Sequence, residues 1–107
     1  DGRFPYNTMK AAVINFCRQC VAQQHGIRFN VICPGLIRTN IMPDEMWDAL
    51  STEEALAQIP SRRIGRPEEP AKLFAFLASE KATFIDGAVI TIDGGWAQTH
   101  ARVLGAT

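Results

Sequence analysis

Tyr6 and Lys10 stand four residues apart in a segment whose pattern predicts a helix, so their side chains project from one face about one turn apart. A free phenol has a pKa near ~10, and lowering it to ~7 requires roughly 4 kcal/mol of preferential stabilisation of the phenolate. One ammonium group at ~4 Å supplies a similar amount at an effective dielectric constant of ~20. The pair could therefore transfer a proton at neutral pH, although Tyr and Lys at this spacing also occur as a solvated pair on helix surfaces.

A long helix is expected to carry this pair. Pro5 suits the first helical position, and Gly26 can adopt the left-handed conformation that ends a helix. Between them, apolar side chains recur at spacings of three and four residues, at Met9, Val13, Phe16 and Cys20. The pattern therefore predicts one helix over residues 5–25, with Tyr6 and Lys10 near its start.

Two strands and further helices are expected along the rest of the chain. Residues 27–33 alternate briefly and then become apolar, which predicts a short strand stopped by Pro34 and Gly35. Residues 88–92 are β-branched and unbroken, which predicts a strand buried on both faces before Asp93-Gly94-Gly95 turns the chain away. Between the strands, the pattern predicts a short amphipathic segment from Asp44 to Leu50, a helix over 55–59 and a helix over 67–80.

Local signals mark the starts of these helices. Ser51 stands three residues before Glu54, the capping-box arrangement in which each side chain satisfies a free backbone N–H. Pro67 and the first-turn acids Glu68 and Glu69 suit the beginning of the helix over 67–80. Its buried stripe is expected at Leu73, Phe74 and Leu77.

The order helix, strand, helices, strand predicts an α/β fold with two parallel strands joined by a right-handed helical crossover. Strands this apolar need neighbours on their edges and helices on both faces. We therefore expect residues 1–107 to be the C-terminal part of a larger single domain, with 97–107 as a loosely held tail. A rival hypothesis is a mature, non-catalytic module that pairs with a longer relative through its open sheet edge.

Composition excludes several other classes of protein. The 107 residues include 11 basic and 11 acidic side chains and 47% hydrophobic residues, as expected of a globular domain. The longest apolar stretch, residues 73–78, is far shorter than the ~20 residues of a membrane span, and the first residues lack an apolar signal core. Residues 1–43 hold five basic and one acidic residue, without the basic run typical of a nucleic-acid site. We expect neither a membrane nor a nucleic-acid partner.

The three cysteines are an odd number and too few for a disulfide scaffold, which favours reduced thiols and a cytoplasmic location. Cys17 and Cys20 form a C-x-x-C spacing, but they lie in the middle of the predicted helix, whereas redox pairs lie at helix N-termini. His25 and His100 stand alone, and no second C-x-x-C completes a metal site. We interpret these thiols as small core residues and expect no metal.

The loop after the first predicted strand is a second candidate site. Pro34 and Gly35 follow that strand directly, and Thr39 lies on the same loop. Open α/β sheets bind ligands outside the carboxyl ends of their strands. Exposed backbone groups and a hydroxyl are therefore expected where a ligand would bind.

Four motifs in this order resemble the short-chain dehydrogenase/reductase family. They are Tyr6-Asn7-Thr8-Met9-Lys10-Ala11, residues 27–39 with Pro34-Gly35 and Thr39, residues 65–69, and Gly87 with Asp93-Gly94-Gly95. The resemblance covers roughly residues 4–96. It implies a Rossmann-like doubly wound parallel sheet, of which this chain holds two strands and the catalytic helix but not the N-terminal nucleotide-binding half.

The resemblance also implies an activity, which is hydride transfer between NAD or NADP and a secondary alcohol or its ketone. Tyr6 would be the proton donor or acceptor, and Lys10 would lower the pKa of Tyr6 and hold the nicotinamide ribose. The loop residues that would fix the nicotinamide ring are Pro34, Gly35, Ile37 through its backbone, and Thr39 through its hydroxyl. The family further implies a homo-tetramer that uses the long helix as an intersubunit surface.

The chain departs from the family pattern in three respects. Only five residues precede Tyr6, so the glycine-rich dinucleotide loop and the asparagine and serine of the catalytic relay have no counterpart, and the chain alone is expected to be inactive. Met9 stands where the family usually has a small residue. Asp86 replaces a usual threonine before Gly87.

Residues 39–64 correspond to the family's substrate lid. A flexible apolar lid would suit a medium-sized, partly hydrophobic ketone or alcohol, and ordinary packing of a short helix is the alternative. The apolar residues of this segment are Met42, Met46, Trp47, Leu50 and Ile59. Arg62, Arg63 and Arg66 form a basic loop that could meet a phosphate or simply be solvated.

Overall fold

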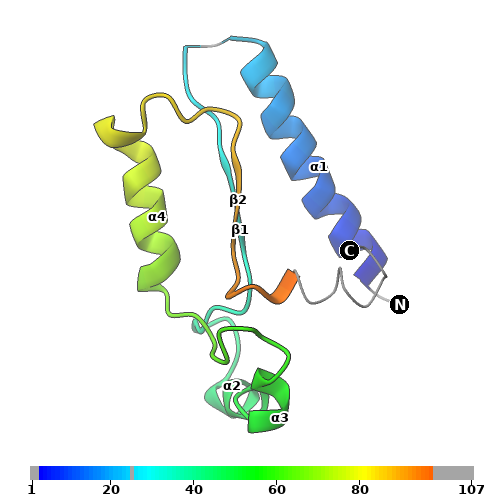
Figure 1. Ribbon diagram of the computed structural model, residues 1–107. Helices are drawn as coiled ribbons and strands as arrows, with labels where there is room; N and C mark the ends of the chain where they lie inside the picture. Colours follow the sequence, from blue (N-terminus) through cyan, green and yellow to red (C-terminus); the bar gives the residue numbers. More distant parts are fainter. Residues whose placement is uncertain (1–2, 25, 98–107) are drawn as a thin grey trace. The chain divides into compact units, whose positions relative to one another are not determined.

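The computed structural model of the chain describes residues 3–24 and 26–97, with side chains from residue 8 onward. In chain order the elements are α1 (Arg3–Ala22), β1 (Val31–Pro34), α2 (Asp44–Leu50), α3 (Glu53–Leu56), α4 (Glu68–Ala78), the 3-10 helix η1 (Glu80–Ala82) and β2 (Val89–Ile92). β1 and β2 pair side by side as a parallel two-stranded sheet (Figure 1). The predicted α/β class with two parallel strands is therefore confirmed.

The chain divides into two compact units. One contains the residues up to 32 together with 74–90, and so includes α1 and η1. The other contains residues 33–73 together with those from 91 on, and so includes α2, α3 and the loops around them. Both strands and α4 run from one unit into the other.

α1 starts two residues before the predicted start and ends at Ala22, three residues before the predicted end. Pro5 lies in its first turn, where the missing N–H breaks no helical hydrogen bond. The left-handed conformation predicted for Gly26 is confirmed at φ 73°, but Gln24 adopts it first, at φ 54°. The helix therefore ends before Gln24, whose N–H donates to Val21 C=O at 3.1 Å.

The buried face of α1 is not the one that defines its apolar pattern. Cys17 is buried, with 7% exposure, and Ile14 and Val21 are half-buried beside it. Of the four residues of the apolar pattern, Cys20 is half-buried, whereas the other three, Met9, Val13 and Phe16, are exposed. α1 therefore presents a second apolar stripe to the outside.

β1 begins at Val31, four residues later than predicted. Just before β1, side chains make some of the hydrogen bonds that a neighbouring strand would otherwise make. Phe29 N–H donates to the Asp86 carboxylate at 3.0 Å. The Asn30 amide donates to Ile85 C=O at 3.0 Å and accepts from Ala88 N–H at 2.9 Å. This segment is thereby held in place before the regular ladder starts.

The predicted capping box is wrong by one residue. Thr52, not Ser51, caps α3, and its hydroxyl accepts from Ala55 N–H at 3.3 Å. Because Ala55 carries no acceptor, the reciprocal bond of a capping box cannot form. Ser51 instead donates its hydroxyl to Trp47 C=O at 2.7 Å, at the end of α2. α2 matches its predicted range, whereas α3 occupies Glu53–Leu56 instead of residues 55–59.

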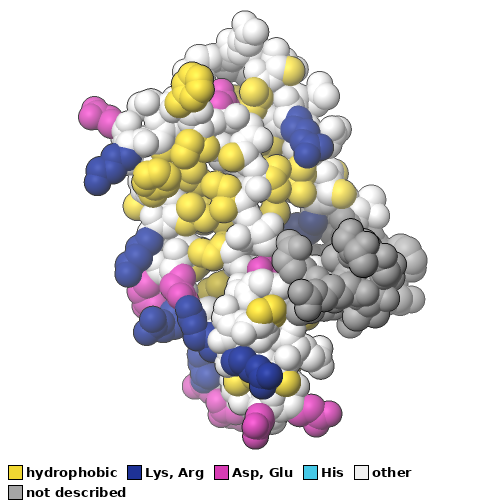
Figure 2. Space-filling view, in the orientation of Figure 1, with side chains coloured by type: hydrophobic (Ala, Val, Ile, Leu, Met, Phe, Trp, Pro, Cys, Tyr) yellow, Lys and Arg dark blue, Asp and Glu magenta, His cyan; other side chains and the backbone are white. Residues whose placement is uncertain are grey.

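Burial along α4 and β2 is less complete than predicted. Leu77 is buried as expected and Leu73 is half-buried, but Phe74 is 61% exposed. β2 alternates between exposed and half-buried residues, so the prediction of burial on both faces is wrong. Figure 2 shows apolar side chains gathered on the surface over α4. No described element covers these positions, and exposed apolar area of this kind usually marks a contact surface.

Candidate functional site

The first candidate site lies on α1. This helix includes both Tyr6 and Lys10, so the four-residue spacing does place them one turn apart along its backbone. The side chain of Lys10 is exposed, and the side chain of Tyr6 lies outside the described part of the structure. The helical premise of the pair is confirmed, while the role of the phenol stays a prediction.

The second candidate site is the loop after β1, which is locked against the end of β2. Gly35 N–H donates to Ile92 C=O at 3.0 Å. A Cβ on Gly35 would lie 2.6 Å from the Cβ of Asp93 and 2.8 Å from its Cα, closer than real Cβ atoms approach. Glycine at position 35 is therefore required by close packing. Pro34, the last residue of β1, is exposed.

Ile37 forms an isolated parallel bridge with Gly65. The bonds of the bridge run from Gly65 N–H to Leu36 C=O, at 2.9 Å, and from Arg38 N–H to Gly65 C=O, at 3.0 Å. In a parallel bridge the N–H and C=O of the central residue point to the opposite side. Within residues 3–24 and 26–97, these two groups of Ile37 have no hydrogen-bond partner. The loop thus offers one donor and one acceptor, side by side, to a ligand.

Thr39 is held by its backbone and leaves its side chain exposed. Its C=O accepts from the indole N–H of Trp47 at 2.8 Å, and Trp47 is 3% exposed. The Thr39 hydroxyl accepts weakly from Ile41 N–H, at 3.3 Å. Because a hydroxyl also carries a proton, Thr39 can still donate a hydrogen bond to a ligand.

Arg38 ties the same loop to α2. Its guanidinium lies 3.0 Å from the Asp44 carboxylate and 3.6 Å from that of Asp48. Together with the Trp47 bond to Thr39, these contacts fix the first turns of α2 beside the loop. In the lid segment, residues 39–64, Trp47 and Ile59 are buried, as expected of ordinary packing. Met46 is exposed, as expected of an apolar side chain in a lid.

The basic loop is organised by an ion pair that the sequence did not reveal. The Arg63 guanidinium binds both carboxylate oxygens of Glu69, at 2.9 and 2.5 Å, and Arg66 N–H donates to the same carboxylate at 2.7 Å. The hydrogen bond with Arg63, followed by that from Arg66 N–H, lowers the pKa of Glu69 from 4.5 to about 2. Arg63 is therefore engaged rather than simply solvated. The only signal in the sequence was an arginine six residues before a first-turn glutamate.

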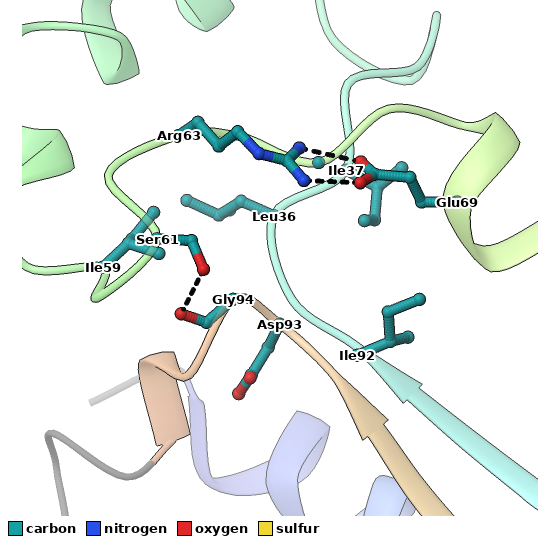
Figure 3. Close-up of a pocket in the computed structure, with 10 residues that line it drawn as sticks. Leu36, Ile37, Ile59, Ser61, Arg63, Glu69, Ile92, Asp93 and Gly94 are labelled. Carbon is teal, nitrogen blue, oxygen red and sulfur yellow. Dashed lines mark hydrogen bonds and ion pairs between the residues drawn. The ribbon is translucent and has the colours of Figure 1, made fainter.

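A hollow of about 110 Å³ lies between this ion pair and the end of β2 (Figure 3). Its polar groups are already engaged within the protein. Ser61 donates to Gly94 C=O at 3.0 Å, and the Asp93 carboxylate accepts from Gly95 N–H at 2.8 Å. Because ligand pockets for drug-sized molecules usually measure ~300 Å³ or more, we assign this hollow to packing rather than to substrate binding.

The cysteines show no sign of a redox pair. Cys17, Cys20 and Cys33 are all free thiols. Burial is the main cause that raises the pKa of Cys17, which makes its thiol less reactive. Among the described residues there is no group of three or more His, Cys, Asp or Glu side chains that could bind a metal ion. His25 and His100 lie outside the described residues, and none of the described helices is long and apolar enough to cross a membrane.

The predicted site residues fall into two groups. Tyr6 and Lys10 belong to the first compact unit. The other four lie close together in the second unit, at the end of β1 and on the loop after it: Pro34, Gly35, Ile37 and Thr39. There the N–H of Gly35 donates to Ile92 C=O, and Ile37 is bridged to Gly65 through the bonds of Leu36 and Arg38. Gly65, Trp47, Arg63 and Glu69 were named from the sequence, but the sequence did not predict that they hold this loop in place.

Comparison with known proteins gives consistent matches. A family model described as enoyl-(acyl carrier protein) reductase matches residues 1–97. Meso-2,3-butanediol dehydrogenase from Serratia marcescens is 42% identical over 96 residues, which cover 84% of this chain and 36% of that protein.

Solved structures agree with the sequence matches. A structure of 4-hydroxyisoleucine dehydrogenase complexed with NADH is similar with a TM-score of 0.77 and 30% identity, over 87% of this chain and 39% of that one. YwfH, an NADPH-dependent reductase involved in bacilysin biosynthesis, has a TM-score of 0.72 and 36% identity, over 83% of this chain and 38% of that one. The chain spans less than two fifths of the length of each of these three proteins. The predicted fold class, part of a Rossmann-like parallel sheet, is confirmed.

Proposed function

Because the chain belongs to the short-chain dehydrogenase/reductase family of oxidoreductases, we propose that its protein transfers a hydride between NAD or NADP and a secondary alcohol or the corresponding ketone. Tyr6 is the proposed proton donor or acceptor, with Lys10 as its cationic partner. The proposed nicotinamide-binding residues are Lys10, Pro34, Gly35, Ile37 and Thr39.

The observation that carries this proposal is the pair of outward-facing backbone groups of Ile37. A primary carboxamide has one acceptor oxygen and an NH₂ group, so it complements the N–H and C=O of one peptide residue. The nicotinamide group ends in such a carboxamide. Ile37 offers this pair because Gly65 engages Leu36 and Arg38 instead. The residues of the loop therefore fit a nicotinamide cofactor, and the exposed hydroxyl of Thr39 adds a further polar contact beside them.

Proton transfer is proposed for Tyr6. A nicotinamide cofactor held by these residues would supply the hydride for the substrate carbon, or take it up from there. During reduction, the phenol O–H of Tyr6 gives its proton to the substrate oxygen, and during oxidation the phenolate takes a proton from the alcohol. Lys10, one turn further along α1, supplies the positive charge that favours the phenolate, and at ~4 Å an ammonium contributes roughly 4 kcal/mol at an effective dielectric constant of ~20.

The choice between NAD and NADP stays open in this proposal. The two solved relatives named above include one complexed with NADH and one described as NADPH-dependent. Contacts that choose between the two dinucleotides lie at the adenosine ribose, where NADP carries its extra phosphate. The residues of this chain are proposed to contact only the nicotinamide end, so they suit both cofactors equally.

Residues 39–64 are proposed to cover the substrate. Within this segment Ile41 and Met46 are exposed apolar side chains, while Trp47 anchors α2 to the loop at Thr39. Exposed apolar residues on and just before an anchored helix suit a substrate that is partly hydrophobic. This supports a small-molecule ketone or alcohol of medium size.

A homo-tetramer in the cytoplasm completes the proposal. The outer stripe of α1, made of Met9, Val13 and Phe16, offers apolar area that a second copy could cover. The three free thiols suit a reducing compartment. A monomeric sedimentation profile of the complete protein would contradict the tetramer.

Replacing Tyr6 with Phe in the complete protein tests the proposed activity. The substitution removes only the phenolic oxygen, so we expect turnover to fall by roughly 10²–10⁴-fold, the contribution of a positioned general acid or base. Binding of NADH or NADPH, measured by fluorescence titration, should stay within about twofold of wild type. Unchanged turnover would exclude Tyr6 from proton transfer.

A further inference from the structure

The turn over residues 63–69 is closed by one carboxylate. Glu69 accepts two hydrogen bonds from the Arg63 guanidinium, at 2.9 and 2.5 Å (Figure 3). It accepts a third from Arg66 N–H, at 2.7 Å. Bidentate pairing of arginine with a carboxylate fixes the relative geometry of the two groups, not only their distance. Because the bonds reach both sides of Gly65, they close the turn around it.

This turn is in direct contact with the loop that follows β1. Gly65 donates its N–H to Leu36 C=O and accepts from Arg38 N–H, at 2.9 and 3.0 Å. The approach is tight, since a Cβ on Gly65 would lie 2.5 Å from Cδ1 of Ile37. The backbone of Ile37 therefore cannot move without moving Gly65 or breaking these bonds.

We propose that Glu69 is a positioning residue for the nicotinamide cofactor, because by closing the turn on Gly65 it fixes the direction in which Ile37 presents its N–H and C=O. The inference rests on the proposed function, since Ile37 acts on the cofactor only if the protein binds one. Glu69 itself contacts Arg63 and the backbone of Arg66 and acts on the cofactor only through Gly65 and Ile37.

The ionised state of Glu69 suits a lasting contact that keeps the turn closed. With its pKa lowered to about 2 by these bonds, the Glu69 carboxylate is ionised throughout the physiological pH range. Its neighbour Glu68 starts the same helix and is exposed, and the Glu68 side chain makes no hydrogen bond or ion pair within the described part of the chain. Glu69 and Glu68 therefore provide a matched comparison between a carboxylate that closes the turn and one that only adds charge at the start of the helix.

The test compares Glu69→Ala with Glu68→Ala in the complete protein, by two measurements. The first is hydrogen exchange of the Arg38 amide in the cofactor-free protein, which reports directly on the bond to Gly65. We expect Glu69→Ala to speed this exchange by about tenfold or more, because the turn opens locally more often. The second is the dissociation constant of NADH and NADPH by fluorescence titration, which should rise by roughly tenfold. Glu68→Ala should leave both values within about twofold of wild type.

Two further variants separate positioning from general destabilisation. Asn30→Ala removes hydrogen bonds to Ile85 and Ala88, which belong with Asn30 to the other compact unit, so it lowers stability without touching the turn. Cofactor affinity should fall in Glu69→Ala by clearly more than in Asn30→Ala. Should Glu69→Ala fail to fold, Arg63→Lys keeps the charge but loses the bidentate geometry, and it should weaken cofactor binding in the same direction.

The outcomes distinguish the two proposals. Unchanged Arg38 exchange and unchanged cofactor affinity in Glu69→Ala would overturn the positioning role and leave the proposed function intact. An affinity loss no larger than that of Asn30→Ala would also overturn it, since the role would then be structural only. A wild-type protein that binds neither NADH nor NADPH would overturn the proposed function, and this inference with it.

Discussion

Gly35 and Asp93 lie so close together that a Cβ on Gly35 would stand 2.6 Å from the Cβ of Asp93. Asp93 cannot easily withdraw, because its carboxylate accepts hydrogen bonds from Gly95 N–H and from Ala97 N–H, both at 2.8 Å. Gly35 is also fixed in place, because its N–H donates to Ile92 C=O. The end of β2 thus determines where the loop after β1 begins, although the two segments are nearly sixty residues apart in the sequence.

Gly35→Ala should therefore both destabilise the protein and weaken cofactor binding. Relieving the clash requires backbone movement, because the nearest atoms at Asp93 are Cβ and Cα. Overpacking of this kind costs about 1–3 kcal/mol in the free energy of unfolding, which urea titration measures. Gly26→Ala is the matched control. A Cβ at position 26 would meet no heavy atom within 4 Å, so this variant tests only the cost of a side chain on a left-handed backbone. If Gly35→Ala bound NADH or NADPH as wild type does, the loop would not need this packing.

Asn30→Ala should lower stability without changing the chemistry. The amide of Asn30 joins Ile85 C=O and Ala88 N–H, at 3.0 and 2.9 Å, and so holds the start of both strands in register. Losing a part-buried group with two partners costs about 1–3 kcal/mol, because both partners are left without a bond. Thermal or urea unfolding measures this loss, with the exposed Asn40→Ala as control. Equal stability of the two variants would contradict the role of Asn30.

Stability in acid should depend on Glu69. Its pKa in the folded protein, about 2, lies below the ordinary value of 4.5. A carboxylate with a lowered pKa stabilises the folded state fully above its unfolded pKa, and the effect is lost as pH falls toward the folded pKa. The free energy of unfolding of wild type should therefore fall more steeply between about pH 4.5 and 2 than that of Glu69→Gln. Urea unfolding at several pH values measures the slopes, and Glu68→Gln should keep the wild-type slope.

Short-range sequence patterns predicted the helices, strands and turns well, but they predicted the burial and hydrogen-bond partners of individual residues less well. The left-handed Gly26, the range of α2 and the turn after β2 follow from glycine, proline and apolar spacing, which act over a few residues. The start of β1 was predicted four residues early, because the bonds of Phe29 and Asn30 go to side chains and backbone beyond residue 84. Phe74 fits the helical stripe by spacing, yet it lies where nothing described covers it.

By itself, the sequence determined the α/β order, the four-residue spacing of Tyr6 and Lys10, and the glycine-proline loop at the end of the first strand, since each depends on neighbours along the chain. Only the tertiary structure decided which backbone groups of that loop remain open to a ligand. Gly65 engages Leu36 and Arg38, so the N–H and C=O of Ile37 have no partner among the described residues. Glu69 holds Gly65 through Arg63. Such choices depend on contacts between segments separated by many residues, which helical or strand periodicity does not encode.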